Sequence, residues 1–231
     1  MCGIVGFTGK TQAAGFLLEG LERLEYRGYD SAGIAVLNDN NLTVCKTTER
    51  IKNLAEKTKG GKDIHGTTGI GHTRWATHGA PSDKNAHPHT SSNGKFAVVH
   101  NGIIENYVAL REELKAEGVE FKSETDTEVI PQMLAHCYTG DFFEAVAKTV
   151  KKLEGSYALG IICTDYPDTL IAVRKFSPLI LGLSDDANYI ASDVTAIVSH
   201  TKDIMYIEDG EIAVLTPCGV KLYDSDKHEL H

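Results

Sequence analysis

The fold is indicated first by residues 33–45, GIAVLNDNNLTVC. Two apolar runs, 33–37 and 42–45, have the period-2 spacing that is typical of β-strands. Asn40 and Asn41 lie between the runs, and asparagine tolerates the positive φ angles of a tight hairpin turn. Because a hairpin makes its two strands antiparallel, this stretch predicts an antiparallel sheet.

The same two periodicities recur along the rest of the chain. Further period-2 runs predict strands at 3–7, 96–99, 157–162, 170–173 and 212–215. Asp209-Gly210 precedes the last run and predicts a second hairpin turn. Apolar residues at helical spacing predict helices around 17–24, 108–114, 129–137 and 143–153. Glycines that suit a helix C-cap follow these patterns at Gly28, Gly118, Gly140 and Gly155.

These elements favour an α+β fold over a doubly wound parallel sheet. Strands come in hairpins and helices cluster between groups of strands, which predicts two packed, mostly antiparallel sheets flanked by helices. The 231 residues suffice for one large domain. Residues 224–231 are uniformly polar, so we expect one domain over 1–223 followed by the start of a linker.

Composition excludes several classes of function. The 23 Lys and Arg against 32 Asp and Glu give a net charge of −9, which disfavours nucleic acid as a partner. The apolar runs are far shorter than the roughly 18 residues of a membrane span. The N-terminus lacks the pattern of a secretory signal, so we expect a cytoplasmic protein. Five scattered cysteines argue against a disulfide framework.

The first candidate for chemistry is Cys2. Removal of Met1 would give this cysteine a free α-amine, whose pKa near ~8 suits it to take the proton of the thiol. One residue would then supply both nucleophile and base. Taken alone, a cysteine at position 2 is more often a chance occurrence than a nucleophile.

A second candidate is residues 71–79, GHTRWATHG, whose polar and bulky side chains are unlike those of an ordinary core strand and predict a binding loop. Arg74 in this segment suits a carboxylate, because its guanidinium donates two parallel hydrogen bonds. The alternative interpretation of Arg74 is an ion pair at the protein surface.

A third candidate is His100-Asn101-Gly102, directly after a predicted strand. Asn101 and Gly102 could donate N–H groups to an oxyanion, although Asn-Gly is also a common turn.

Residues 124–128, ETDTE, precede a predicted helix and have the composition of a helix N-cap. In the functional alternative, Asp126 binds the ammonium group of an amino acid whose carboxylate is bound by Arg74.

The sequence indicates neither a metal site nor a phosphate-binding loop. The histidines lack the spacing of a metal site, and the Gly-rich segments lack the context of a phosphate loop. We therefore expect no metal and no cofactor.

Together these segments resemble the class II glutamine amidotransferases, and within them the glutaminase half of the glucosamine-6-phosphate synthases, which are isomerizing glutamine:fructose-6-phosphate aminotransferases. The resemblance covers nearly the whole chain and rests on residues 2–6, 26–33, 71–79, 100–106 and 123–128. Residues 26–30 read YRGYD, whereas the similar amidophosphoribosyltransferases usually read His-Arg-Gly-Gln-Asp there.

The resemblance implies a fold, a reaction and roles for particular residues. The fold is the four-layer αββα sandwich of N-terminal-nucleophile hydrolases, and the reaction is hydrolysis of L-glutamine to glutamate and ammonia through a thioester. The implied nucleophile is Cys2, the oxyanion hole is Asn101 and Gly102, and the clamps for glutamine are Arg74 and Asp126. A loop closing over glutamine would contain Trp75, Thr77 and His78, and the nucleophile would be supported by Arg27 and Gly28.

The family's complete enzyme has a second, sugar-phosphate isomerase half that accepts the ammonia and converts fructose-6-phosphate to glucosamine-6-phosphate. That half is absent from these 231 residues. Two other functions stay open at this point: a non-catalytic glutamine-binding module, and the glutaminase domain of another class II amidotransferase.

Overall fold

The hairpin predicted at residues 33–45 is present in the computed structural model, which describes residues 2–27, 30–75 and 81–230. Strand β2 (Ser31–Asn38) pairs antiparallel with β3 (Asn41–Thr47), and Asn38 lies opposite Asn41. The turn is therefore formed by Asp39 and Asn40, one residue earlier than predicted, and Asp39 takes the positive φ of 52°.

This hairpin lies at the edge of the first of two seven-stranded sheets, each counted over the described residues. The strands of this first sheet all pair antiparallel with their neighbours. In spatial order they are β11 (Asp203–Tyr206), β9 (Ile180–Leu183), β10 (Ala187–Ala191), β1 (Gly3–Gly9), β4 (Thr68–Arg74), β2 and β3.

The second sheet is also antiparallel. In spatial order its strands are β14 (Glu229–Leu230), β13 (Gly219–Tyr223), β12 (Ile212–Thr216), β8 (Leu170–Lys175), β7 (Gly155–Cys163), β6 (Phe96–Ile104) and β5 (His89–Thr90).

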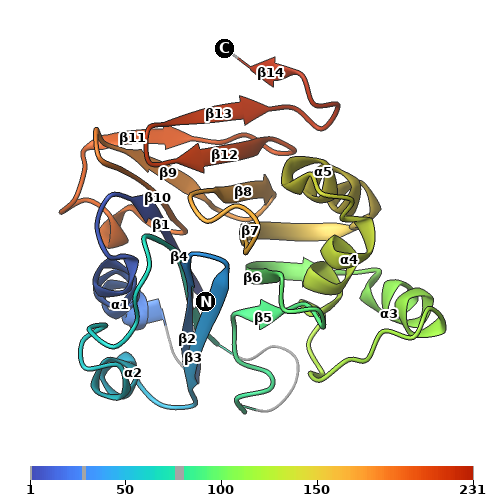
Figure 1. Ribbon diagram of the computed structural model, residues 1–231, viewed down its shortest axis with the longest axis horizontal. Coiled ribbons are helices and arrows are strands. Elements are labelled where there is room, and N and C mark those ends of the chain that lie inside the picture. The colour runs from blue at the N-terminus through green and yellow to red at the C-terminus, as the bar shows by residue number, and fades with distance from the viewer. Residues whose placement is uncertain (1, 28–29, 76–80, 231) are drawn as a thin grey trace.

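Helices cover the outer face of each sheet (Figure 1). On the first sheet lie α1 (Ala13–Leu24), α2 (Ile51–Lys57) and the 3-10 helices η1 (Glu25–Arg27) and η2 (Val194–Ala196). On the second lie α3 (Tyr107–Ala116), α4 (Val129–Cys137) and α5 (Phe142–Lys152). The layers therefore follow the order helices, sheet, sheet, helices.

The four layers enclose three apolar cores, because successive side chains of a strand point to opposite faces. In β6, Phe96 and Val98 pack against the α3–α5 layer, whereas Ala97 and Val99 pack between the sheets. Both faces of the strand are thus buried, and the run is apolar throughout instead of alternating with polar residues.

Two predictions from the sequence are wrong in detail. Residues 71–74 belong to β4, a strand inside the first sheet, and not to a loop. Asp209-Gly210 makes a turn in which Gly210 has a φ of 89°, but it forms no hairpin because β11 and β12 belong to different sheets. The turn carries the chain from one sheet to the other.

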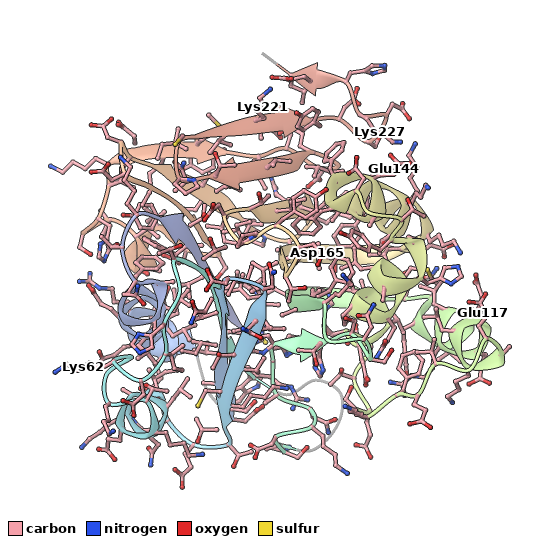
Figure 2. The ribbon with its side chains drawn as sticks, viewed as in Figure 1. Lys62, Glu117, Glu144, Asp165, Lys221 and Lys227 are labelled. Atoms are coloured by element: carbon pink, nitrogen blue, oxygen red, sulfur yellow. The ribbon has the colours of Figure 1, made fainter. Side chains whose placement is uncertain are left out.

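The segment after Tyr223 adds the edge strand β14 to the second sheet. Leu230 lies opposite Leu222 in the β13–β14 pairing, and Lys227 forms an ion pair with Glu144 of α5 (Figure 2). The expected boundary between a domain and a linker at 223 stays a prediction. Among the helices that the structure describes, none is long and apolar enough to cross a membrane.

Candidate active site

Strand alternation brings two of the predicted residues to the space between the sheets. Ile4 of β1 and Val99 of β6 belong to the core between the sheets. Side chains two positions apart on a strand share a face, so Cys2 and Asn101 are directed to the same space from opposite sheets. Both line one pocket.

Strand β4 contributes to this pocket for the same reason. Ile70 lies in the core between the sheets, and His72 and Arg74 follow on that face at two-residue steps. On the other face, α1 packs closely on glycines: a Cβ at Gly71 would lie 3.0 Å from a methyl group of Leu21. Arg74 thus lines the site, His72 is buried on the same face of the strand, and the glycines on the other face permit the helix to approach.

The pocket has a volume of about 440 Å³. It is lined from both sheets and from the loops that follow their strands. Its lining residues are Cys2, Arg74, Trp75, His87, His100, Asn101, Gly102, Ile103, Thr125, Asp126, Thr127, Ser156, Ser177, Pro178 and Ser192. The structure therefore brings together the five residues for which the sequence predicted catalysis or binding of glutamine's charged groups.

The Cys2 thiol contacts the backbone of Trp75. The Trp75 N–H donates to Sγ at 3.2 Å, and Sγ lies 3.5 Å from the Trp75 carbonyl oxygen. Burial raises the pKa of the Cys2 thiol, while the hydrogen bond from Trp75 acts in the opposite direction. A nearby base is therefore needed to form the thiolate at neutral pH.

Asn101 and Gly102 line the same pocket as Cys2 and lie near the end of β6. Asn101 Nδ2 donates to the Cys2 carbonyl at 3.3 Å. Gly102 has a φ of 122°, and a Cβ there would lie 2.1 Å from the Ser156 carbonyl oxygen of β7. Only glycine fits this position, so the backbone next to Asn101 stays uncovered by a side chain.

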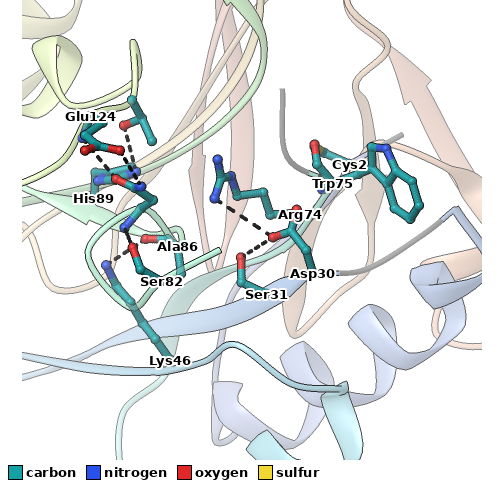
Figure 3. A network of polar contacts seen from close by, with 12 residues as sticks. Cys2, Asp30, Ser31, Lys46, Arg74, Trp75, Ser82, Ala86, His89 and Glu124 are labelled. Atoms are coloured by element: carbon teal, nitrogen blue, oxygen red, sulfur yellow. Dashed lines mark hydrogen bonds and ion pairs between the residues drawn. The ribbon is translucent and has the colours of Figure 1, made fainter. Parts of the chain in front are cut away.

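Arg74 is buried at the end of β4, with 3% of its surface exposed. Its Nη1 lies 3.9 Å from Asp30 Oδ1, and Ser31 Oγ donates to the same carboxylate oxygen at 2.9 Å (Figure 3). Figure 3 also shows Cys2 and Trp75 on the far side of Arg74 from Lys46, whose Nζ donates a hydrogen bond to the Ala86 carbonyl at 2.7 Å. Asp30 was not assigned a role from the sequence, although it lies in one of the segments that carry the resemblance.

Asp126 lies across the pocket, before α4. Its Oδ2 accepts a hydrogen bond from the Ile104 N–H at 2.8 Å, and the residue is 7% exposed. The helix N-cap is Glu128, which makes no side-chain capping bond. The capping interpretation of residues 124–128 is therefore wrong, and Asp126 is available to the pocket.

The remaining predicted residues are less fully described. Trp75 follows β4 and is 55% exposed. Arg27 ends η1, but its side chain lies outside the described part of the chain. Gly28, Thr77 and His78 also lie outside the described residues.

Four buried histidines form a cluster at the pocket that the sequence did not predict: His87 and His100 line the pocket, and His72 and His89 lie behind them. His72 and His87 stack with ring centroids 4.0 Å apart, and His87 meets His89 edge-on at 4.7 Å. Thr127 Oγ1 lies 3.1 Å from His87 Nε2 and 2.8 Å from His100 Nδ1. The only sequence signal was the number of histidines, and their spacing showed no pattern that would predict a cluster.

Burial is the main cause that lowers the pKa of all four imidazoles. For His72 the value falls from 6.5 to about 3. The cluster is therefore neutral at physiological pH. Within the described residues, no group of three or more His, Cys, Asp or Glu side chains is arranged to hold a metal ion.

Residues 72–199 match a family model described as a glutamine amidotransferase domain. The isomerizing glutamine–fructose-6-phosphate aminotransferase of Clostridium acetobutylicum is 56% identical over 230 residues, which is 100% of this chain and 38% of that protein. The protein of the same name from Aquifex aeolicus is 57% identical over 224 residues, 97% of this chain and 38% of its own length. The chain thus spans 38% of the length of each of these relatives.

Among solved structures, the glutamine phosphoribosylpyrophosphate amidotransferase from B. subtilis, complexed with ADP and GMP, is similar. It has a TM-score of 0.83 at 27% identity, over 97% of this chain and 49% of that one. This likeness, together with the two antiparallel sheets and their helices, confirms the predicted αββα sandwich.

Proposed function

This chain belongs to the glutamine amidotransferase domain family, and from that membership and the pocket we propose that it hydrolyses L-glutamine to glutamate and ammonia with Cys2 as the nucleophile. One observation carries the proposal: Cys2, Asn101, Gly102, Arg74 and Asp126 line the same pocket. Arg74 comes from β4 of the first sheet, Asn101 and Gly102 come from β6 of the second, Cys2 directly precedes β1, and Asp126 lies in the loop before α4. Each has the chemistry that one part of this reaction requires.

The proposed reaction begins with transfer of the thiol proton to the α-amine that Cys2 acquires when Met1 is removed. The thiolate attacks the side-chain amide carbon of glutamine, and Asn101 Nδ2 and the Gly102 N–H stabilise the resulting oxyanion. The α-ammonium group of Cys2 donates its proton to the side-chain nitrogen of glutamine, and ammonia leaves. Water then hydrolyses the γ-glutamyl thioester, which releases glutamate and regenerates the thiol.

The substrate would be held at its two charged ends. Arg74 suits the α-carboxylate because its planar guanidinium donates paired hydrogen bonds, and Asp126 supplies the opposite charge for the α-ammonium. Trp75, with Thr77 and His78, would cover the bound glutamine. Arg27 and Gly28 would support the nucleophile.

We propose the activity of the complete protein by analogy with its relatives, because this chain spans 38% of the length of the Clostridium acetobutylicum protein. In it, a sugar-phosphate isomerase half would accept the ammonia and make glucosamine-6-phosphate from fructose-6-phosphate. The 56% identity to a fructose-6-phosphate aminotransferase, against 27% to a phosphoribosylpyrophosphate amidotransferase, favours this acceptor. The cytoplasmic location also stays a prediction.

The test is intact mass and glutamate release measured on one preparation, with Cys2→Ala as the control. We expect loss of the Met1 mass and release of glutamate that Cys2→Ala abolishes. A folded, Met-free protein that binds glutamine and releases no ammonia would instead establish a non-catalytic binding module. A form that retains Met1 should be nearly inactive, because its Cys2 nitrogen is an amide.

The oxyanion hole is tested by Asn101→Ala. Loss of one oxyanion donor typically lowers the turnover rate roughly 10²–10³-fold, whereas KM should change little because the carboxylate and ammonium clamps remain. Normal turnover in this variant would exclude the assigned role of Asn101.

A further inference from the structure

His72 contacts Asn101 from below the pocket. Its Nε2 lies 2.9 Å from Asn101 Oδ1 and 3.0 Å from the His100 carbonyl oxygen, and the residue is 0% exposed. A carbonyl oxygen can only accept a hydrogen bond. The Nε2 atom must therefore carry the hydrogen that both oxygens share.

The other ring nitrogen agrees with this tautomer. A neutral imidazole has one N–H, and His72 Nδ1 has no hydrogen-bond partner among the residues that the structure describes. Burial keeps this ring neutral by lowering its pKa to about 3. His72 is thus a donor at Nε2 and is unprotonated at Nδ1.

The tautomer in turn decides which way the Asn101 amide faces. A donor at Nε2 requires the amide oxygen on its side, and the NH₂ group is then left to face Cys2, whose carbonyl it meets at 3.3 Å. The opposite orientation would place NH₂ against N–H and would direct a carbonyl oxygen toward the developing oxyanion. Only the observed orientation supplies a donor.

We propose that His72 is a positioning residue, which fixes the Asn101 amide with its NH₂ group toward the reacting carbonyl. The inference rests on the proposed glutaminase function. His87 stacks on the His72 ring at an interplanar angle of 17° and is itself bonded to Thr127. This packing holds the His72 ring in the plane that both hydrogen bonds need.

The experiment compares His72→Gln with His72→Asn. The glutamine amide can place an N–H near the former Nε2, whereas the shorter asparagine amide reaches only the region of Nδ1. We expect His72→Asn to lose roughly 10–10²-fold in kcat with little change in KM, a part of the roughly 10²–10³-fold that removal of the donor costs. His72→Gln should recover most of that loss.

A glutamine analogue with an aldehyde in place of the amide separates positioning from general damage. It forms a tetrahedral adduct with the thiol that uses the oxyanion hole, whereas L-glutamate uses the clamps. We expect His72→Asn to weaken aldehyde binding by about the same factor as kcat and to leave glutamate binding unchanged. An equal loss for both ligands, or wild-type kcat in His72→Asn, would overturn the proposal.

The coupling to Asn101 is tested by a double-mutant cycle. In an Asn101→Ala background, His72→Asn should cause no further loss of kcat, and additive losses would contradict a role through Asn101. The tautomer can be checked without any variant, because ¹⁵N–¹H correlation spectra of histidine-labelled protein distinguish the two; an Nδ1-protonated His72 would also overturn the inference. Glutamate release by wild type that Cys2→Ala abolishes tests the proposed function separately from each of these outcomes.

Discussion

The four buried histidines should make the protein sensitive to mild acid. Burial lowers the pKa of His72, His87, His89 and His100 below the ordinary value of 6.5, and neighbouring rings of the cluster add to the shift at His87. At pH values between the lowered pKa of a folded-state ring and 6.5, the unfolded chain binds protons that the folded protein does not bind. The free energy of unfolding must therefore fall as pH falls below 6.5, down to about pH 3 for His72.

The magnitude follows from the linkage relation. A ring that stays neutral in the folded state but titrates near 6.5 in the unfolded state lowers the free energy of unfolding by about 1 kcal/mol between pH 6.5 and 5.5. The four rings together would lower it by about 4 kcal/mol as an upper limit, a large fraction of the roughly 5–15 kcal/mol of a typical domain.

The assay is urea denaturation at several pH values between 6.5 and 5.5, with His89→Gln as the variant and His65→Gln as the control. His89 is buried and bonds Thr125 at 3.1 Å, whereas His65 is exposed. We expect His89→Gln to reduce the pH dependence by about 1 kcal/mol over this range, and His65→Gln to leave it unchanged. A free energy of unfolding that is flat across this range in wild type, or equal slopes in wild type and His89→Gln, would refute the reasoning.

Three further predictions concern the pocket. Gly102→Ala should abolish glutaminase activity and destabilise the fold, since its Cβ would lie 2.1 Å from the Ser156 carbonyl oxygen; Gly210→Ala, which also has a positive φ but open space around it, is the control and should remain active. Asp126→Asn should raise KM for glutamine roughly 10–100-fold, the worth of a hydrogen bond to a charged group, and an unchanged KM in steady-state assays would exclude an ammonium clamp. Arg74→Lys should raise KM by a similar factor through loss of the paired donors, and retained affinity for L-glutamate by calorimetry would argue against that role.

Much of the fold could be predicted from local patterns. The apolar runs of β1, β2, β6 and β7 and the helical spacing of α4 follow from side chains that each element must bury, so they are visible in any short window of sequence. Strand β4 could not be predicted in this way. Its His72, Thr73 and Arg74 are polar, and they are buried only because β1 and β2 flank the strand while the second sheet covers one face and α1 the other.

For the candidate site, the kinds of chemistry available could be read from the sequence: a thiol at position 2, a guanidinium at 74, an amide at 101 and a carboxylate at 126. That these groups line one pocket, and that His72 lies under Asn101 with a single N–H to donate, depends on the packing of the two sheets. The two kinds of information differ because the interactions differ in range along the chain. Strand alternation is local and can be read along the chain, whereas the tautomer of a buried ring depends on partners from another sheet.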